Sequence, residues 1–174
     1  MGVIMIDKKV CIKCERLLPI SNFHNNKNTK DGKRVYCKDC VKAYQQAYQK
    51  TPMGIYNQIK SRSRYRAKHD KPYWKDVTIS AKEFVNWYEN EPKICAYCGI
   101  LENKLSLRQG GFDKRVSRLE VDCKDNELGY AKGNIVLACH LCNFIKLHIF
   151  NHDEMIEIGE KFIKPKWKEL DVER

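Results

Sequence analysis

The sequence predicts a small α+β protein in which bound zinc supplements a limited hydrophobic core. The chain has 174 residues, of which 43% are hydrophobic and 32% are charged. A chain of this size that folds in more than one unit buries little apolar surface in each, so further stabilisation is expected. Short strand-like and helical patterns follow cysteine pairs in both halves of the chain. Eight of the nine cysteines form these Cys-x-x-Cys pairs, namely Cys11/Cys14, Cys37/Cys40, Cys95/Cys98 and Cys139/Cys142.

The four pairs predict two closed zinc sites. Residues 1–10 lack the features of a signal peptide, and in a reducing compartment paired cysteines favour metal over disulfides. Zinc prefers four tetrahedral ligands, and one Cys-x-x-Cys turn supplies two of them. Unrelated buried cysteines would not repeat one spacing four times. We therefore expect two structural Zn²⁺ per chain, one held by Cys11, Cys14, Cys37 and Cys40 and the other by Cys95, Cys98, Cys139 and Cys142.

The first unit, an N-terminal four-cysteine zinc module, is expected over residues 1–50. Its cysteine pairs enclose an extended stretch at 17–23 and a polar loop at 25–32, whose Asn, Asp and Gly residues favour turns. After the second pair, apolar residues recur at helical spacing from position 41 to 48. The unit is therefore expected to be two cysteine turns followed by a helix.

A basic helical connector is expected over residues 51–79. Pro52 suits the first turn of its helix, and aromatic residues, among them Tyr73 and Trp74, lie between the charges. Basic side chains at 60, 64 and 68 would share one helical face. A solvated face is the simpler interpretation, whereas phosphate contacts agree with the charge of the whole chain. The candidate contacts are Lys60, Arg62, Arg64, Arg66 and Lys68.

The last unit is expected over residues 80–174. Ser80 and Glu83 form a capping box that begins a helix reaching about Asn90. A glycine-containing stretch at 109–111 lies before the strands. The elements predicted next are strands at 118–124 and 134–138, a helix at 139–150, and a last helix that Asn151 and Glu154 can cap.

The charge of the chain favours a polyanionic partner. Lys and Arg total 33 against 22 Asp and Glu, a formal net charge of +11. Basic side chains that neutralise phosphates release condensed counterions, which drives nucleic-acid binding. A membrane partner is not expected, because the chain has no Lys-rich amphipathic helix and no run of about 18 apolar residues. We therefore expect an intracellular protein that binds nucleic acid.

The region from about 93 to 163 resembles the HNH (ββα-metal) endonucleases. In that family a strand ends in Asp-His, an Asn opens the second strand, and a helix that begins with Cys-x-x-Cys carries a final His or Asn. Here Asp122, Asn134 and Asn143 occupy these positions, whereas Cys123 replaces the His. The four-cysteine N-terminal module and the Cys-x-Tyr-Cys-Gly turn resemble a branch of the family that contains rare-cutting type II restriction enzymes.

The resemblance implies a ββα-metal nuclease core with a catalytic Mg²⁺ or Mn²⁺. Asp122 and Asn143 would be its ligands, since oxygen atoms suit both ions. Asn134 would brace the loop through backbone hydrogen bonds. Taken singly, an Asp or Asn beside a turn is more often a cap, but the joint spacing of the three favours the metal site.

Cys123 leaves the general base open. A thiol lacks the fixed charge and the suitable pKa that this role requires, and a buried Cys that fills a small space is the simpler interpretation. The resemblance offers two replacements, Tyr97 in the cysteine turn and His69 in the connector. Each also has a simpler interpretation: Tyr97 as an aromatic that packs on the zinc site, and His69 as a solvated residue.

The resemblance also implies that the partner is double-stranded DNA in the cytoplasm of a bacterium or a phage-infected cell, and it implies how that DNA is held. The ββα element would lie on the minor groove and the backbone, where Lys146 and His148 are candidate phosphate contacts, or members of a solvated helix face. His140 is expected to face solvent. Base reading would then fall to the N-terminal zinc module and the connector. Cleavage of both strands implies a homodimer.

Three functions remain open. The first is a site-specific, metal-dependent endonuclease used in restriction, and the second is a phage homing or nicking enzyme that acts as a monomer. The third is a zinc-stabilised DNA-binding protein that has lost catalysis, for which Cys123 is the best argument.

Overall fold

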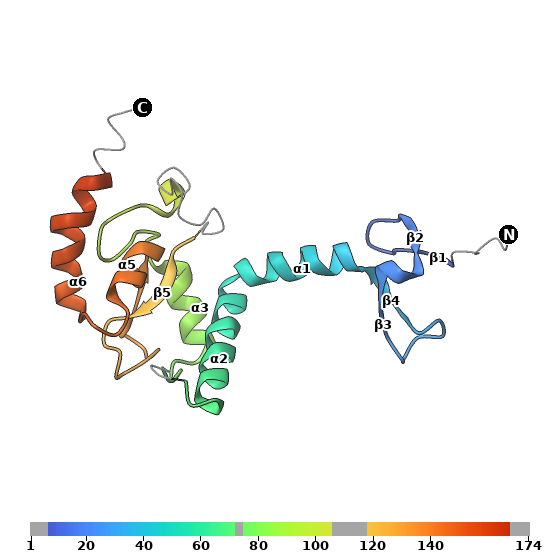
Figure 1. Ribbon diagram of the computed structural model, residues 1–174, viewed down its shortest axis with the longest axis horizontal. Coiled ribbons are helices and arrows are strands. Elements are labelled where there is room, and N and C mark those ends of the chain that lie inside the picture. Colours follow the sequence, from blue (N-terminus) through green and yellow to red (C-terminus); the bar gives the residue numbers. More distant parts are fainter. Residues whose placement is uncertain (1–6, 72–74, 106–117, 168–174) are drawn as a thin grey trace. The chain divides into compact units, whose positions relative to one another are not determined.

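The computed structural model describes residues 7–71, 75–105 and 118–167. They form two compact units, Met1–Ile55 and Tyr56–Arg174, so residues of the expected connector fall in both. Tyr73, Trp74 and the 109–111 stretch lie outside the described residues. Figure 1 shows the order of the elements. No helix in the described ranges is both long and apolar enough to cross a membrane.

The first unit consists of two small antiparallel hairpins and a helix. Strand β1 (Lys8–Val10) pairs with β2 (Leu17–Pro19), and β3 (Phe23–Asn25) pairs with β4 (Lys33–Cys37). The stretch expected to be continuously extended at 17–23 is interrupted by a 3-10 turn, η1 (Ile20–Asn22). Its buried cluster is small and contains Cys11, Phe23 and Cys37.

Two consecutive helices follow, α1 (Lys38–Lys50) and α2 (Pro52–Lys68). The break falls at Thr51, whose hydroxyl accepts a hydrogen bond from Gly54 N at 3.0 Å and so caps the second helix. A Cβ atom on Gly54 would collide with the Tyr48 carbonyl. The prediction that Pro52 opens a helix is confirmed, and glycine permits the close approach of the chain.

The second unit is built on an aromatic core around α3 (Ala81–Asn90). The capping box expected from Ser80 and Glu83 is present, and Phe84 and Tyr88 are the buried residues of the helix. Phe84 contacts the ring of Tyr56 on α2, with centroids 5.4 Å apart. The Tyr56 hydroxyl donates to Ile79 O at 3.2 Å, which attaches α2 to the segment that leads into α3.

The remaining elements are a hairpin and the helices that follow it. Strand β5 (Glu120–Cys123) pairs antiparallel with β6 (Ile135–Ala138), so that Asp122 lies opposite Val136. Helix α5 (His140–Lys146) lies beside β5 in Figure 1. After α5 come the helix α6 (His152–Ile158), with its expected Asn151–Glu154 capping box, and a π-helical turn, η3 (Gly159–Ile163).

Three of these elements are shorter than the sequence patterns predict. Strand β6 begins at Ile135 instead of at 134. Strand β5 spans 120–123 instead of 118–124. Helix α5 ends at Lys146 instead of near 150, because Leu147 has φ +43° and leaves the helical region. The order of strand, loop, strand and helix is nevertheless the predicted one, and it places the ends of β5 and α5 in a single small region.

Candidate functional site

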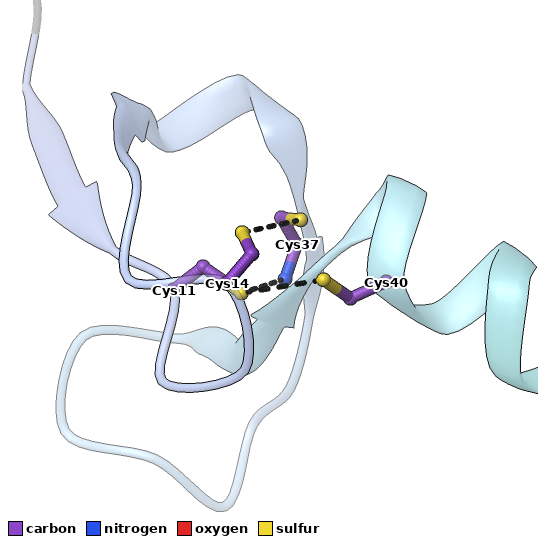
Figure 2. A group of neighbouring side chains, drawn as sticks. All are labelled: Cys11, Cys14, Cys37 and Cys40. Carbon is purple, nitrogen blue, oxygen red and sulfur yellow. Dashed lines mark hydrogen bonds between the residues drawn. The ribbon is translucent and has the colours of Figure 1, made fainter.

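The four cysteines of the first unit are arranged for one tetrahedral metal ion. Figure 2 shows their sulfur atoms directed toward one another from the first cysteine turn and from the start of α1. The Sγ atoms of Cys11 and Cys40 are 3.8 Å apart, those of Cys14 and Cys37 are 3.9 Å apart, and all four lie within 4.8 Å of one another. A tetrahedral Zn²⁺ with bonds of about 2.3 Å requires sulfur separations of about 3.8 Å. The geometry therefore fits zinc.

Nearby donors favour the thiolate form of two of these cysteines, Cys11 and Cys14. Burial alone would raise the pKa of Cys11, but backbone N–H groups, foremost that of Cys37 at 3.3 Å, lower it to about 6. Arg16 donates its Nε–H to Cys14 Sγ at 3.3 Å and lowers the pKa of that thiol. Deprotonated thiolates are the form that binds zinc.

The second four-cysteine group lies inside the second unit. Cys95, Cys98, Cys139 and Cys142 are all buried, and their sulfur atoms are again within 4.8 Å of one another. Cys98 Sγ and Cys139 Sγ are 3.7 Å apart. The two four-cysteine groups expected from sequence are thus confirmed, and both fit structural zinc, because four sulfur ligands leave no open position for water.

The second group also fixes two candidate site residues. Tyr97 lies between Cys95 and Cys98, and Asn143 directly follows Cys142. Ala96 N donates to Leu137 O at 2.8 Å, which attaches the cysteine turn to β6. A metal ion at this group would therefore hold the Tyr97 turn against the β6–α5 junction.

Asp122 is a buried carboxylate with three donors. It is 2% exposed. The Tyr97 hydroxyl donates to Asp122 Oδ2 at 2.8 Å, Lys146 Nζ lies 3.5 Å from the same oxygen, and Lys75 Nζ lies 3.5 Å from Oδ1. These partners offset the cost of removing the carboxylate from water. Lys75 and the pairing of Lys146 with Asp122 were not predicted from sequence.

Two of the residues considered as the base are protonated and buried. Cys123 is fully buried, and burial raises the pKa of its thiol to about 12. Burial, followed by the negative charge of Asp122, raises the pKa of Tyr97 well above its usual range. Tyr97 therefore serves as a hydrogen-bond donor, and its ring packs against His152 with centroids 5.6 Å apart.

Asn143 has a different partner from Asp122. Its Nδ2 donates to Glu120 Oε2 at 2.6 Å, and His140 Nδ1 lies 3.0 Å from Glu120 Oε1. Glu120 was not among the candidate residues. Strand periodicity was the available signal, because Glu120 lies two residues before Asp122 and so shares its face of β5.

Asn134 lies where the resemblance expects a residue that braces the loop. Its Nδ2 donates to Asp125 O at 2.8 Å and to Gly129 O at 2.7 Å, and its Oδ1 accepts from Asp125 N at 3.0 Å. These three bonds close the 124–133 loop over the end of β5. A loop held in this way keeps Asp122 and Cys123 in fixed positions.

Lys146 lies on neither a phosphate-contacting nor a solvated helix face. Its side chain is 0% exposed, and its Nζ donates to Cys123 O at 2.8 Å. The turn after Lys146 leaves His148 exposed. Lys146 is thus a structural link between α5 and β5, and its expected direct contact with DNA does not agree with its burial.

The basic residues of α2 lie near this region. Ser63 Oγ on α2 donates to Lys75 O at 2.7 Å. Burial raises the pKa of Tyr130, and the positive charges of Arg62 and Arg66 oppose that rise. Lys60 Nζ lies 5.4 Å from the ring centroid of Tyr56, and the ring of His69 packs at a tilt against Tyr65 with centroids 4.4 Å apart. His69 itself is exposed.

Comparison with known proteins identifies a fold. No protein-family model and no curated protein sequence matches the chain. One matching solved structure is that of PacI, described as a rare-cutting HNH restriction endonuclease with an extraordinary mechanism of DNA perturbation. The two chains are 26% identical and align with a TM-score of 0.52 over 91% of this chain and 95% of PacI. The resemblance to PacI-like HNH endonucleases and the predicted fold class are confirmed.

Proposed function

We propose that this protein is a site-specific, divalent-metal-dependent endonuclease that hydrolyses phosphodiester bonds in double-stranded DNA, and that it acts as a type II restriction enzyme. The observation that carries the proposal is the β5–β6–α5 element, which presents Asp122 and Asn143 in a fold that aligns with PacI over most of both chains. We further propose that it acts as a homodimer in the cytoplasm, since two symmetric active sites cut both strands of a palindrome.

The proposed metal ligands are Asp122 and Asn143. Their oxygen atoms suit Mg²⁺ or Mn²⁺. Before a metal ion binds, Lys75 and Lys146 balance the negative charge of the Asp122 carboxylate. When bound, such an ion would stabilise the charge on the phosphate and on the leaving 3′-oxygen. Tyr97 holds Asp122 Oδ2 through its hydroxyl, which limits the orientations of the carboxylate.

The proposed base is His69. Of the three residues considered for this role, Cys123 and Tyr97 are buried, whereas His69 is exposed and lies at the end of the basic helix α2. In the proposed reaction His69 accepts a proton from water as the water oxygen attacks phosphorus and the P–O3′ bond breaks. The leaving O3′ takes a proton from a second water molecule of the solvent, which gives a 5′-phosphate and a 3′-hydroxyl.

The experiment that tests this function is cleavage of supercoiled plasmid and phage DNA in Mg²⁺ or Mn²⁺. Wild type should give discrete linear fragments, and Asp122→Ala should give none. Asp153→Ala, which removes an exposed carboxylate from α6, is the matched control and should cut normally. Nicked circles alone would support the monomeric nicking enzyme instead.

A DNA-binding protein without catalysis is the second candidate. The observation that favours it is the buried Cys123 thiol at the position where the family usually has its base. Salt-sensitive DNA binding without cleavage in either metal would support this function and contradict the first.

A further inference from the structure

Strand β5 presents two acidic side chains to one helix. Because side chains alternate along a strand, Glu120 and Asp122 share a face. Each has a partner on α5: Asp122 pairs with Lys146, and Glu120 contacts Asn143 and His140. Only Asp122 has an assigned role in the proposed function, which leaves the role of Glu120 to be explained.

The chemistry of the Glu120 carboxylate fixes the orientation of the Asn143 amide. An ionised carboxylate can only accept hydrogen bonds, so the amide atom that faces it at 2.6 Å must be Nδ2. The carbonyl oxygen, Oδ1, then points away from Glu120. Oδ1 is the atom that a hard divalent cation would bind, whereas a flipped amide would present a donor that repels it.

The same carboxylate fixes the tautomer of His140. Nδ1 must carry the proton that it donates to Glu120 Oε1 at 3.0 Å. His140 is 46% exposed on its side chain and Glu120 is 35% exposed on its side chain. Both therefore lie at an open edge of the element, unlike Asp122.

We propose that Glu120 is a positioning residue of the catalytic metal site, which holds the Asn143 amide so that Oδ1 faces the ion. The inference rests on the proposed function, because it assumes that Asn143 is a metal ligand. Outer hydrogen-bond partners of metal ligands typically contribute a factor of about 10 to 100 in metal affinity. A residue that served only stability would not contribute in this way.

The test is Mn²⁺ binding to the full zinc-loaded chain without DNA, measured by electron paramagnetic resonance. Glu120→Leu should weaken Mn²⁺ binding by about 10- to 100-fold and should raise the Mn²⁺ concentration for half-maximal cleavage by the same factor. Glu120→Gln should bind nearly as wild type, because its amide oxygen still accepts from Asn143. Glu120→Asp keeps the charge but withdraws it by one methylene, and should weaken binding.

The relative Mn²⁺ affinities of these variants distinguish a positioning role from a purely electrostatic one. If Glu120 acted only through its charge, Glu120→Asp would bind Mn²⁺ as wild type does and Glu120→Gln would bind it more weakly. The matched control is Glu127→Leu, which removes an exposed carboxylate from the loop after β5 and should leave binding unchanged. Zinc content of two per chain reports that each variant is folded. If Glu120→Leu fails to fold, the Mn²⁺ affinities of Glu120→Asp and Glu120→Gln still test whether Glu120 positions Asn143.

A double variant completes the test. In an Asn143→Ala background the ligand is absent, so Glu120→Leu should weaken Mn²⁺ binding no further. Additive losses, or wild-type binding by Glu120→Leu, would overturn the role of Glu120. Neither result contradicts the proposed endonuclease function if Asp122→Ala still abolishes cleavage.

Discussion

Lys146 is the residue whose structural role differs most from its expected one. It lies on a helix beside a candidate metal ligand, a position in which a basic side chain commonly reaches DNA phosphate. Instead it is buried, and it joins Cys123 O and Asp122 to α5. Burial lowers its pKa, and the nearby Asp122 carboxylate opposes that shift. A charge in this position stabilises the fold only while its partners are present.

Replacing Lys146 should therefore destabilise the second unit. Lys146→Met keeps the length of the side chain but leaves Asp122 with fewer donors, and breaking such a buried pair should cost about 3 kcal/mol. The measurement is urea unfolding followed by tryptophan fluorescence with zinc present. Lys164→Met, which breaks only an exposed pair with Glu160, should change stability by less than about 0.5 kcal/mol. Equal unfolding midpoints for the two variants would contradict the structural role of Lys146.

Among the secondary-structure elements, features that depend on neighbouring residues could be predicted from the sequence, whereas features that depend on tertiary contacts could not. Both capping boxes, at Ser80 and at Asn151, form as expected because their partners lie three residues apart. The end of α5 was misplaced because the turn at Leu147 depends on how the following chain packs. Lys75 was missed for a similar reason: its partner, Asp122, is distant in sequence, and only the fold brings the two together.

Helix α2 is the element whose proposed role is easiest to measure. If Arg62 and Arg66 bind phosphates, Arg62→Gln/Arg66→Gln should reduce the slope of log K against log salt by about 1.8, since each contact contributes about 0.9. Fluorescence anisotropy of a labelled duplex in Ca²⁺ at several salt concentrations gives the slope. Lys161→Gln/Lys164→Gln, whose side chains pair with Glu157 and Glu160, should leave it unchanged. A slope that both double variants lower equally would indicate a nonspecific charge effect.

At the scale of the whole molecule, the two groups that fit zinc lie in different units. Each unit contains its own four-cysteine group, and the cysteine spacing alone was sufficient to predict the members of both groups. Only the second group is continuous with candidate catalytic residues, because Tyr97 lies within it and Asn143 follows it. The two ions are therefore expected to have unequal effects on activity, although both stabilise folding.

Removal of one ligand at a time should reveal this difference. Native mass spectrometry should find two zinc ions in the wild type and one in each of Cys14→Ser and Cys142→Ser. Cys142→Ser should abolish cleavage because it releases the start of α5, whereas Cys14→Ser should keep metal-dependent cutting with altered DNA affinity. A single substitution that empties both groups would show that the units do not fold separately.

The adjacency of Cys142 and Asn143 also bears on how the protein is made. During translation the ribosome releases Cys95, Tyr97 and Cys98 well before the second half of their zinc group. A nascent chain that stops before Cys139 has neither the second pair of thiolates nor the Asn143 amide. If Asn143 is a metal ligand as proposed, premature termination would yield fragments that lack nuclease activity.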